Sequence, residues 1–163
     1  MIPEQQLAPP SVARAATALS TNAPIRVLLV EDDPDAAAIH VIALTSDPSD
    51  LFKMVWCSDL SSAMIKLTEP VHDVILLDLG LPEMSGYRSL RAIELMAENA
   101  LPVVILTSDD SKLTRDLTIG YGSGKSGKYR VCSYLVKNRT SSEQLRQALR
   151  AAVYGFGNHG PWD

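Results

Sequence analysis

Residues 74–86 read Val-Ile-Leu-Leu-Asp-Leu-Gly-Leu-Pro-Glu-Met-Ser-Gly, a short apolar run that leads directly into a single carboxylate. The four residues before Asp78 have the pattern of a strand buried on both faces, as a central parallel strand is. Gly80 and Pro82 interrupt regular structure after this strand, and we expect Ser85 to cap the helix that follows. The stretch therefore predicts a strand, an acid, a turn and a helix, the arrangement in which α/β folds place their chemistry.

Four other apolar runs alternate with helical patterns along the chain. We expect strands at 25–30, 51–57, 103–106 and 133–136, and helices at about 34–45, 60–67, 87–97 and 111–119. A last helix should begin at a capping box formed by Thr140 and Glu143. Because a helix separates each strand from the next, the sheet should be parallel and covered on both faces. The predicted fold is a flavodoxin-like, doubly wound, five-stranded parallel sheet with strand order 2-1-3-4-5.

Composition limits the class of protein. The 163 residues are 46% hydrophobic, which suits one ordinary globular domain, and the formal net charge of -4 argues against broad nucleic-acid binding. No apolar run approaches the roughly 18 residues that a membrane span needs, so we expect a cytoplasmic protein. Cys57 and Cys132 fit neither a metal-binding spacing nor a disulfide framework, and we expect both to be reduced thiols.

Polar side chains end four of the five predicted strands: Glu31 with Asp32, then Asp78, Thr107 and Lys137. In the predicted topology these strand ends converge at one edge of the sheet. Carboxylates held close together repel one another unless a cation lies among them, and oxygen ligands without His or Cys favour Mg²⁺. An ammonium and a hydroxyl group suit the oxygens of a phosphoryl group. The sequence thus predicts a metal-assisted site with Asp78 as the nucleophile.

Four blocks of sequence resemble response-regulator receiver domains of two-component signalling, and the resemblance covers about residues 25–153. The blocks are Val-Leu-Leu-Val-Glu-Asp-Asp-Pro at 27–34, Ile-Leu-Leu-Asp-Leu-Gly-Leu-Pro-Glu-Met-Ser-Gly at 75–86, Val-Val-Ile-Leu-Thr-Ser at 103–108 and Tyr-Leu-Val-Lys at 134–137. The resemblance implies a switch that accepts a phosphoryl group from the phosphohistidine of a sensor histidine kinase. By this resemblance Asp78 is the phosphoacceptor, and the protein is a signalling domain that at most catalyses its own phosphorylation and dephosphorylation.

The same resemblance assigns the metal ligands and the switch residues. Asp32, Asp78 and the backbone carbonyl of Gly80 would bind Mg²⁺, and Glu31 would shape the acidic pocket, partly through water. The remaining residues would respond to the phosphate: Lys137 pairs with the carboxylate and then with phosphoryl oxygens, Thr107 moves to hydrogen-bond the phosphate, and Tyr134 changes rotamer.

Composition and the resemblance together predict a domain organisation and partners. We expect a flexible tail or linker at 1–23, a receiver domain at 24–154 and a C-terminal tail at 155–163. The phosphoryl donor would be a sensor histidine kinase or a phosphotransfer protein. A downstream protein would bind the side formed by the fourth helix, the last strand and the last helix, with no direct contact to nucleic acid or membrane. We expect the glycine-rich stretch 120–131 to be an irregular insertion that contacts this partner, with a tolerated surface loop as the alternative.

Some features depart from the family pattern and leave other interpretations open. Asn138 stands where the family usually has proline after the lysine, and Gly80 places no side chain two residues after the nucleophile. The same fold could serve as an interaction module that phosphate does not switch. A phosphate hydrolase would need a second acid at the position of Gly80. A phosphate-binding loop at 122–126 would need a glycine where Ile119 stands.

Overall fold

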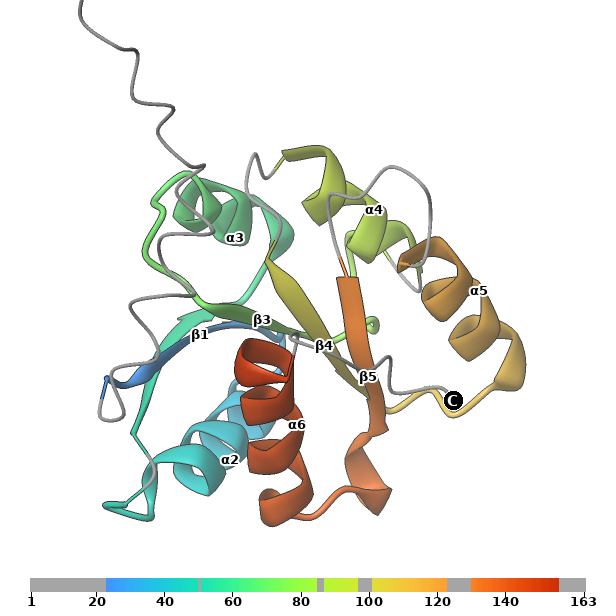
Figure 1. The fold of residues 1–163 in the computed structure, drawn as a ribbon. Coiled ribbons are helices and arrows are strands. Elements are labelled where there is room, and N and C mark those ends of the chain that lie inside the picture. The colour runs from blue at the N-terminus through green and yellow to red at the C-terminus, as the bar shows by residue number, and fades with distance from the viewer. Residues whose placement is uncertain (1–22, 50, 85–86, 97–100, 123–129, 156–163) are drawn as a thin grey trace, which may run out of the picture.

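The computed structural model describes residues 23–155 with gaps at 50, 85–86, 97–100 and 123–129 (Figure 1). Five strands pair side by side in the order β2-β1-β3-β4-β5, and every neighbouring pair is parallel. This confirms the predicted flavodoxin-like fold. The elements are β1 Ile25–Val30, α2 Pro34–Thr45, β2 Phe52–Cys57, α3 Leu60–Leu67, β3 Val74–Leu77, α4 Tyr87–Met96, β4 Pro102–Thr107, α5 Lys112–Gly122, β5 Arg130–Val136, the 3-10 turn η1 Lys137–Arg139, and α6 Ser142–Tyr154.

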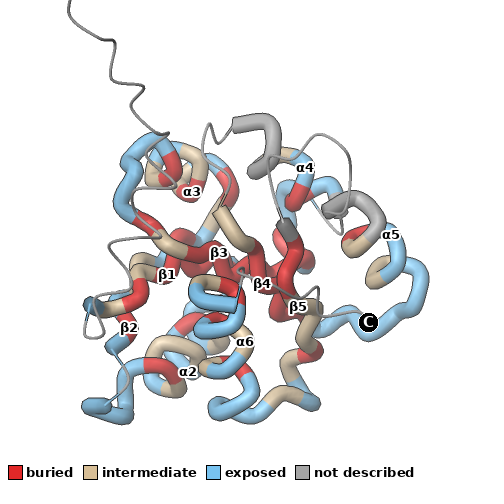
Figure 2. Tube along the Cα trace, viewed as in Figure 1, coloured by how far each residue is buried: buried red, intermediate tan, exposed pale blue. Residues whose placement is uncertain are grey.

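Helices cover both faces of the sheet: α2 and α6 lie on one face, and α3, α4 and α5 lie on the other (Figure 1). Side chains of each strand alternate between the two resulting cores. In β1, Leu28 and Val30 pack toward α3 and α4, whereas Val27 and Leu29 pack toward α2 and α6. The buried residues accordingly concentrate along the sheet (Figure 2). All four residues of β3 are fully buried, as predicted for the central strand.

Side-chain caps fix where the helices begin. Asp33 caps α2, because its carboxylate accepts a hydrogen bond of 2.9 Å from the Asp35 amide while Pro34 occupies the first turn. The predicted capping box at Thr140 and Glu143 is wrong by one residue. Ser141 and Gln144 form the box instead, and the Thr140 hydroxyl donates to the Val136 carbonyl at 2.8 Å.

The segment around the predicted insertion also differs from expectation. Helix α5 continues to Gly122 and strand β5 already begins at Arg130, so the irregular stretch is shorter than the predicted 120–131. Residues 123–129 lie outside the described part of the chain, as do Ser85 and almost all of the two predicted tails. The extra length of β5 lets it pair with β4 from Pro102 onward. Among the helices described, none is long and apolar enough to cross a membrane.

Candidate functional site

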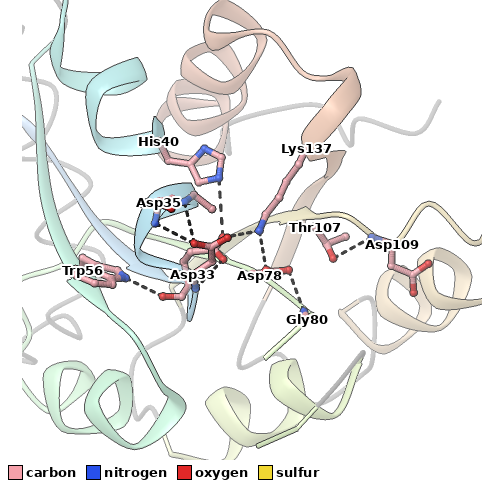
Figure 3. A network of polar contacts seen from close by, with 11 residues as sticks. Asp33, Asp35, His40, Trp56, Asp78, Gly80, Thr107, Asp109 and Lys137 are labelled. Atoms are coloured by element: carbon pink, nitrogen blue, oxygen red, sulfur yellow. Dashed lines mark hydrogen bonds and ion pairs between the residues drawn. The ribbon is translucent and has the colours of Figure 1, made fainter. Parts of the chain in front are cut away.

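The carboxyl ends of the central strands bring the predicted site residues together. Glu31 directly follows β1, Asp78 follows β3, Thr107 ends β4 and Lys137 follows β5. These residues line one open pocket of about 650 Å³, together with Asp32, Asp33, Leu79, Gly80, Ser108, Asp109 and Thr114. Figure 3 shows how the polar groups point toward one another. The parallel topology therefore produces the convergence that the strand ends predicted.

Lys137 is the electrostatic centre of this pocket. Its Nζ donates to Glu31 Oε2 at 2.6 Å and to Asp78 Oδ2 at 2.7 Å (Figure 3). Burial alone would lower the pKa of the ammonium, but its hydrogen bonds and Coulombic attraction to the two carboxylates outweigh burial and raise that pKa above its usual value. Lys137 is therefore charged at neutral pH, and it holds the two acids together.

Asp78 is held on both of its carboxylate oxygens. Oδ2 accepts from Lys137, and Oδ1 accepts from the backbone amide of Gly80 at 2.9 Å. A Cβ atom at position 80 would lie only 3.4 and 3.5 Å from the two carboxylate oxygens of Asp78. Glycine at this position therefore leaves one side of the carboxylate uncovered.

Glu31 is almost completely buried, with 1% of its surface exposed. Burial raises the pKa of its carboxyl group, and the hydrogen bond from Lys137 opposes that shift. Its Oε1 accepts a long hydrogen bond of 3.3 Å from the Asp33 amide. Its backbone carbonyl accepts a hydrogen bond of 2.8 Å from the indole Nε1 of Trp56, which comes from the edge strand β2.

Three carboxylates form a cluster that fits a hard cation. Glu31, Asp32 and Asp78 each offer an oxygen, and these oxygens lie within 4.8 Å of one another. Asp32 is exposed while the other two are buried, so the cluster opens to water on one side. Mg²⁺ binds carboxylate oxygens and keeps several water ligands, so this donor set suits it. No other group of three acids, histidines or cysteines in the described residues is arranged in this way.

Thr107 and Tyr134 are linked through the loop after β4. Thr107 is buried, and its hydroxyl accepts a hydrogen bond of 3.3 Å from the Asp109 amide. The Tyr134 hydroxyl donates to the Asp109 carbonyl at 2.8 Å, and the Arg115 guanidinium lies 5.3 Å from the centre of the Tyr134 ring. Thr107 thus lines the acidic pocket, whereas Tyr134 lines a separate groove beside α6.

Two residues beside the acids, Trp56 and His40, are not among the site residues predicted from the sequence. His40 projects from α2, and its Nε2 lies 3.9 Å from Glu31 Oε2, which is too long for a hydrogen bond (Figure 3). Burial lowers the pKa of the imidazole, and the charge of Lys137 lowers it further. A signal for His40 was present in the sequence, because it falls at helical spacing between the buried residues Ala37 and Leu44.

Comparisons with known proteins identify related sequences. The family described as "Response regulator receiver domain" matches residues 27–124. Protein-glutamate methylesterase/protein-glutamine glutaminase 3 of Rhodopseudomonas palustris is 37% identical over 84 residues, which is 52% of this chain and 22% of that protein. The DNA-binding response regulator MtrA of Mycolicibacterium smegmatis is 35% identical over 99 residues, 61% of this chain and 40% of that protein. The chain therefore spans from about a fifth to two fifths of these relatives.

Solved structures agree with the sequence comparisons. The receiver domain of the sensor histidine kinase PA1611 from Pseudomonas aeruginosa PAO1 has a TM-score of 0.64 and 25% identity, and the match covers 80% of this chain and 98% of that one. That structure holds a magnesium ion coordinated in its active-site cleft. A CheY-like receiver domain protein from Methanospirillum hungatei has a TM-score of 0.63 and 17% identity, and the match covers 80% and 94% of the two chains. This second likeness supports the fold alone.

Proposed function

The chain belongs to the response regulator receiver domain family of two-component signalling, and on that premise we propose that it is switched by phosphorylation of Asp78. The observation that carries the proposal is the position of Lys137, which bonds both Asp78 and Glu31 at the edge of an acidic pocket that suits Mg²⁺. We assign the receiver domain to residues 24–154. Its phosphoryl donor would be the phosphohistidine of a sensor histidine kinase or phosphotransfer protein.

The chemistry is an in-line transfer between two nucleophiles. A carboxylate oxygen of Asp78 attacks the phosphorus, the new O–P bond forms, and the N–P bond to the donor imidazole breaks with its electron pair left on the nitrogen. Asp32, Asp78, the Gly80 carbonyl and, through water, Glu31 would hold Mg²⁺. When bound, this ion supplies positive charge against the phosphoryl oxygens.

Phosphorylation of Asp78 would change the conformation of the protein through three residues, Lys137, Thr107 and Tyr134. The added phosphoryl oxygens attract the Lys137 ammonium and offer acceptors to the Thr107 hydroxyl. A movement of Thr107 is transmitted to Asp109, because the two residues are hydrogen-bonded, and Asp109 in turn is bonded to Tyr134. Phosphorylation would therefore alter Tyr134 without touching it.

The output surface would lie around Tyr134. A groove of about 500 Å³ runs between β5, η1 and α6, and it is lined by Arg115, Tyr134, Leu135, Val136, Arg139, Thr140, Gln144, Gln147, Ala148 and Ala151. A change at Tyr134 would reshape this groove. We propose that a downstream protein partner binds here and that residues 120–131 contribute to its recognition.

Intact-mass spectrometry tests the function directly. Incubation with acetyl phosphate and Mg²⁺ should add the mass of one phosphoryl group to the wild type and to Asp116→Asn, which changes an exposed acid on α5. EDTA or the Asp78→Asn substitution should abolish the addition. Absence of labelling in a folded, Mg²⁺-loaded wild type would instead favour an interaction module that phosphate does not switch, and labelling of Asp78→Asn would place the acceptor elsewhere.

A further inference from the structure

His40 is a polar side chain beside the acidic pocket that the proposed phosphoryl transfer does not use. Only 12% of this side chain is exposed, and its Nε2 is enclosed without a hydrogen-bond partner among the described residues. The nearest carboxylate oxygen, Glu31 Oε2, lies 3.9 Å away. This distance exceeds that of an ordinary hydrogen bond by about 1 Å.

Within the described ranges of the chain, Lys137 is the one hydrogen-bond donor to Glu31 Oε2, at 2.6 Å. There, Oε1 has only the long contact of 3.3 Å from the Asp33 amide. A buried carboxylate that loses its hydrogen-bond donor is destabilised unless another donor takes that place. If Lys137 moves away from Glu31, the Oε2 atom therefore needs another hydrogen-bond donor.

Lys137 is also the group that a phosphoryl group on Asp78 would attract. Its Nζ now lies between Glu31 Oε2 and Asp78 Oδ2, and its flexible four-carbon stem can shift toward added negative charge on the Asp78 side. A donor at Glu31 that carries no charge of its own would release Lys137 without competing for the phosphoryl oxygens. A neutral imidazole with its proton on Nε2 is such a donor.

We propose that His40 is a positioning residue that replaces Lys137 as the hydrogen-bond donor to Glu31 when Lys137 moves to a phosphoryl group on Asp78. The movement of Lys137 rests on the proposed function, but the capacity of His40 to replace it does not. In the unphosphorylated protein His40 lies beside Glu31 without donating a hydrogen bond to it. In the phosphorylated protein it keeps the Glu31 carboxylate in place beside the metal ligands.

The first test removes Lys137 without any phosphorylation. In ¹⁵N-histidine-labelled Lys137→Met, NMR should show a slowly exchanging, hydrogen-bonded Nε2–H at His40 that the wild type lacks. His72 is the control histidine, because it is also shielded from solvent, with 3% of its surface exposed, but precedes β3 at the opposite end of the sheet, and its signals should not change. An unchanged His40 in folded Lys137→Met, or a His40 with its proton on Nδ1 alone, would overturn the proposal.

The second test asks whether a different hydrogen-bond donor at position 40 can replace His40. With Mg²⁺ and beryllofluoride, which mimics a phosphoryl group on a carboxylate, His40→Leu should raise the dissociation constant about tenfold, as loss of a hydrogen bond to a charged group predicts. His40→Gln retains an N–H donor and should restore most of the affinity. Equal weakening by both substitutions would overturn the proposal. A wild type that fails to bind beryllofluoride refutes the proposed function, and the Lys137→Met spectra then decide the role of His40 alone.

Discussion

Lys137 determines the charge balance of the acidic pocket. It is one ammonium shared between Glu31 and Asp78, and Asp32 adds a third carboxylate that has no cation within bonding distance among the described residues. With all four groups ionised, the pocket keeps an excess of two negative charges. A divalent cation would neutralise that excess, and the trianionic donor set would otherwise repel an incoming phosphate.

At the residue scale, Asp32→Asn should weaken the binding of Mg²⁺ while leaving the other residues of the pocket unchanged. The substitution removes a hard anionic ligand while preserving the shape of the side chain, so the affinity for Mg²⁺ should fall roughly tenfold or more. Phosphorylation by acetyl phosphate should fall with it. Isothermal titration with Mg²⁺ measures the first effect and intact mass the second.

Asp33→Asn is the matched control for this prediction. Asp33 is the adjacent acid, but it is not a member of the carboxylate cluster, and Asn caps helices as well as Asp does. Its Mg²⁺ affinity should stay close to that of the wild type. If Asp32→Asn binds Mg²⁺ as tightly as Asp33→Asn, then Asp32 is not a ligand.

The individual residues of the pocket differ in how well the sequence predicts them. Asp78 and Lys137 could be found because each directly follows an apolar strand, and the ends of parallel strands must converge. His40 and Trp56 could not be placed in this way, since their contacts to Glu31 depend on how α2 and β2 pack beside β1. Such contacts are properties of packing, so the helical spacing of His40 indicates a core-facing position but does not identify Glu31 as its neighbour.

At the scale of single elements, the start of α6 shows why a correct motif can be placed at the wrong residue. Thr140 with Glu143 and Ser141 with Gln144 both match the spacing of a capping box. The structure uses the second pair, because the Thr140 hydroxyl is already bonded to Val136 in the turn after β5. The choice between overlapping motifs is thus made by the preceding element.

Ser141→Ala should therefore destabilise the fold by about 1 kcal/mol, the usual effect of removing an N-cap hydroxyl. Urea denaturation monitored by circular dichroism measures this change. Ser142→Ala, at the neighbouring exposed residue, should change stability by less than about 0.5 kcal/mol. A larger effect at Ser142 than at Ser141 would contradict the observed cap.

Helix α2 begins immediately after the acidic residues that follow β1, and it carries two exposed isoleucines. Ile39 is 63% exposed and Ile42 is 64% exposed. Large exposed apolar side chains on such a helix suit contact with a protein donor. A small-molecule donor has no need of them.

Ile39→Glu combined with Ile42→Glu should slow transfer from a sensor histidine kinase that phosphorylates the wild type, by about tenfold or more. Phosphorylation by acetyl phosphate should be unchanged, because the pocket itself is intact. Ile65→Glu is the control, since Ile65 is 67% exposed on α3 at the opposite face of the sheet. Equal slowing by Ile65→Glu, or equal loss with acetyl phosphate, would argue against docking on α2.

At the scale of the whole molecule, the alternation of strands and helices predicted a parallel, doubly wound sheet, and the strand order was predicted from the flavodoxin-like form of that fold. The boundaries around α5 and β5 were not. Gly120 and Gly122 have poor intrinsic helix propensity and indicated a loop, yet the helix continues through them. Likewise, pairing with β4 extends β5 back to Arg130, which only the partner strand determines. Tertiary context outweighs local preference at both places.

Stability of the whole domain should depend on pH through His72. This residue is 3% exposed, and burial lowers its pKa below the usual 6.5, so the folded protein binds the proton less readily than the unfolded chain. The stability that neutral His72 confers is present above its unfolded pKa and is lost as the pH falls below it. The loss can reach at most about 1.4 kcal/mol per pH unit for one group.

Urea denaturation at about pH 7.5 and about pH 5.5 checks this prediction. The wild type should be less stable at the lower pH, and His72→Gln should lose less stability between the two conditions. His40, whose pKa burial also lowers, is present in both proteins, so the difference between them isolates His72. Identical pH dependence in the two proteins would show that His72 does not titrate differently on folding.

The fluorescence of Trp56 should report on what the acidic pocket binds. Its indole is 45% exposed and donates to the Glu31 carbonyl at 2.8 Å, so the ring lies next to the backbone that presents the acidic residues. Indole emission responds to nearby charge, and filling the pocket with a cation or a phosphoryl group should therefore shift it. Trp56→Phe separates this emission from that of Trp162. The unlabelled protein can then report its own state in a stopped-flow fluorimeter.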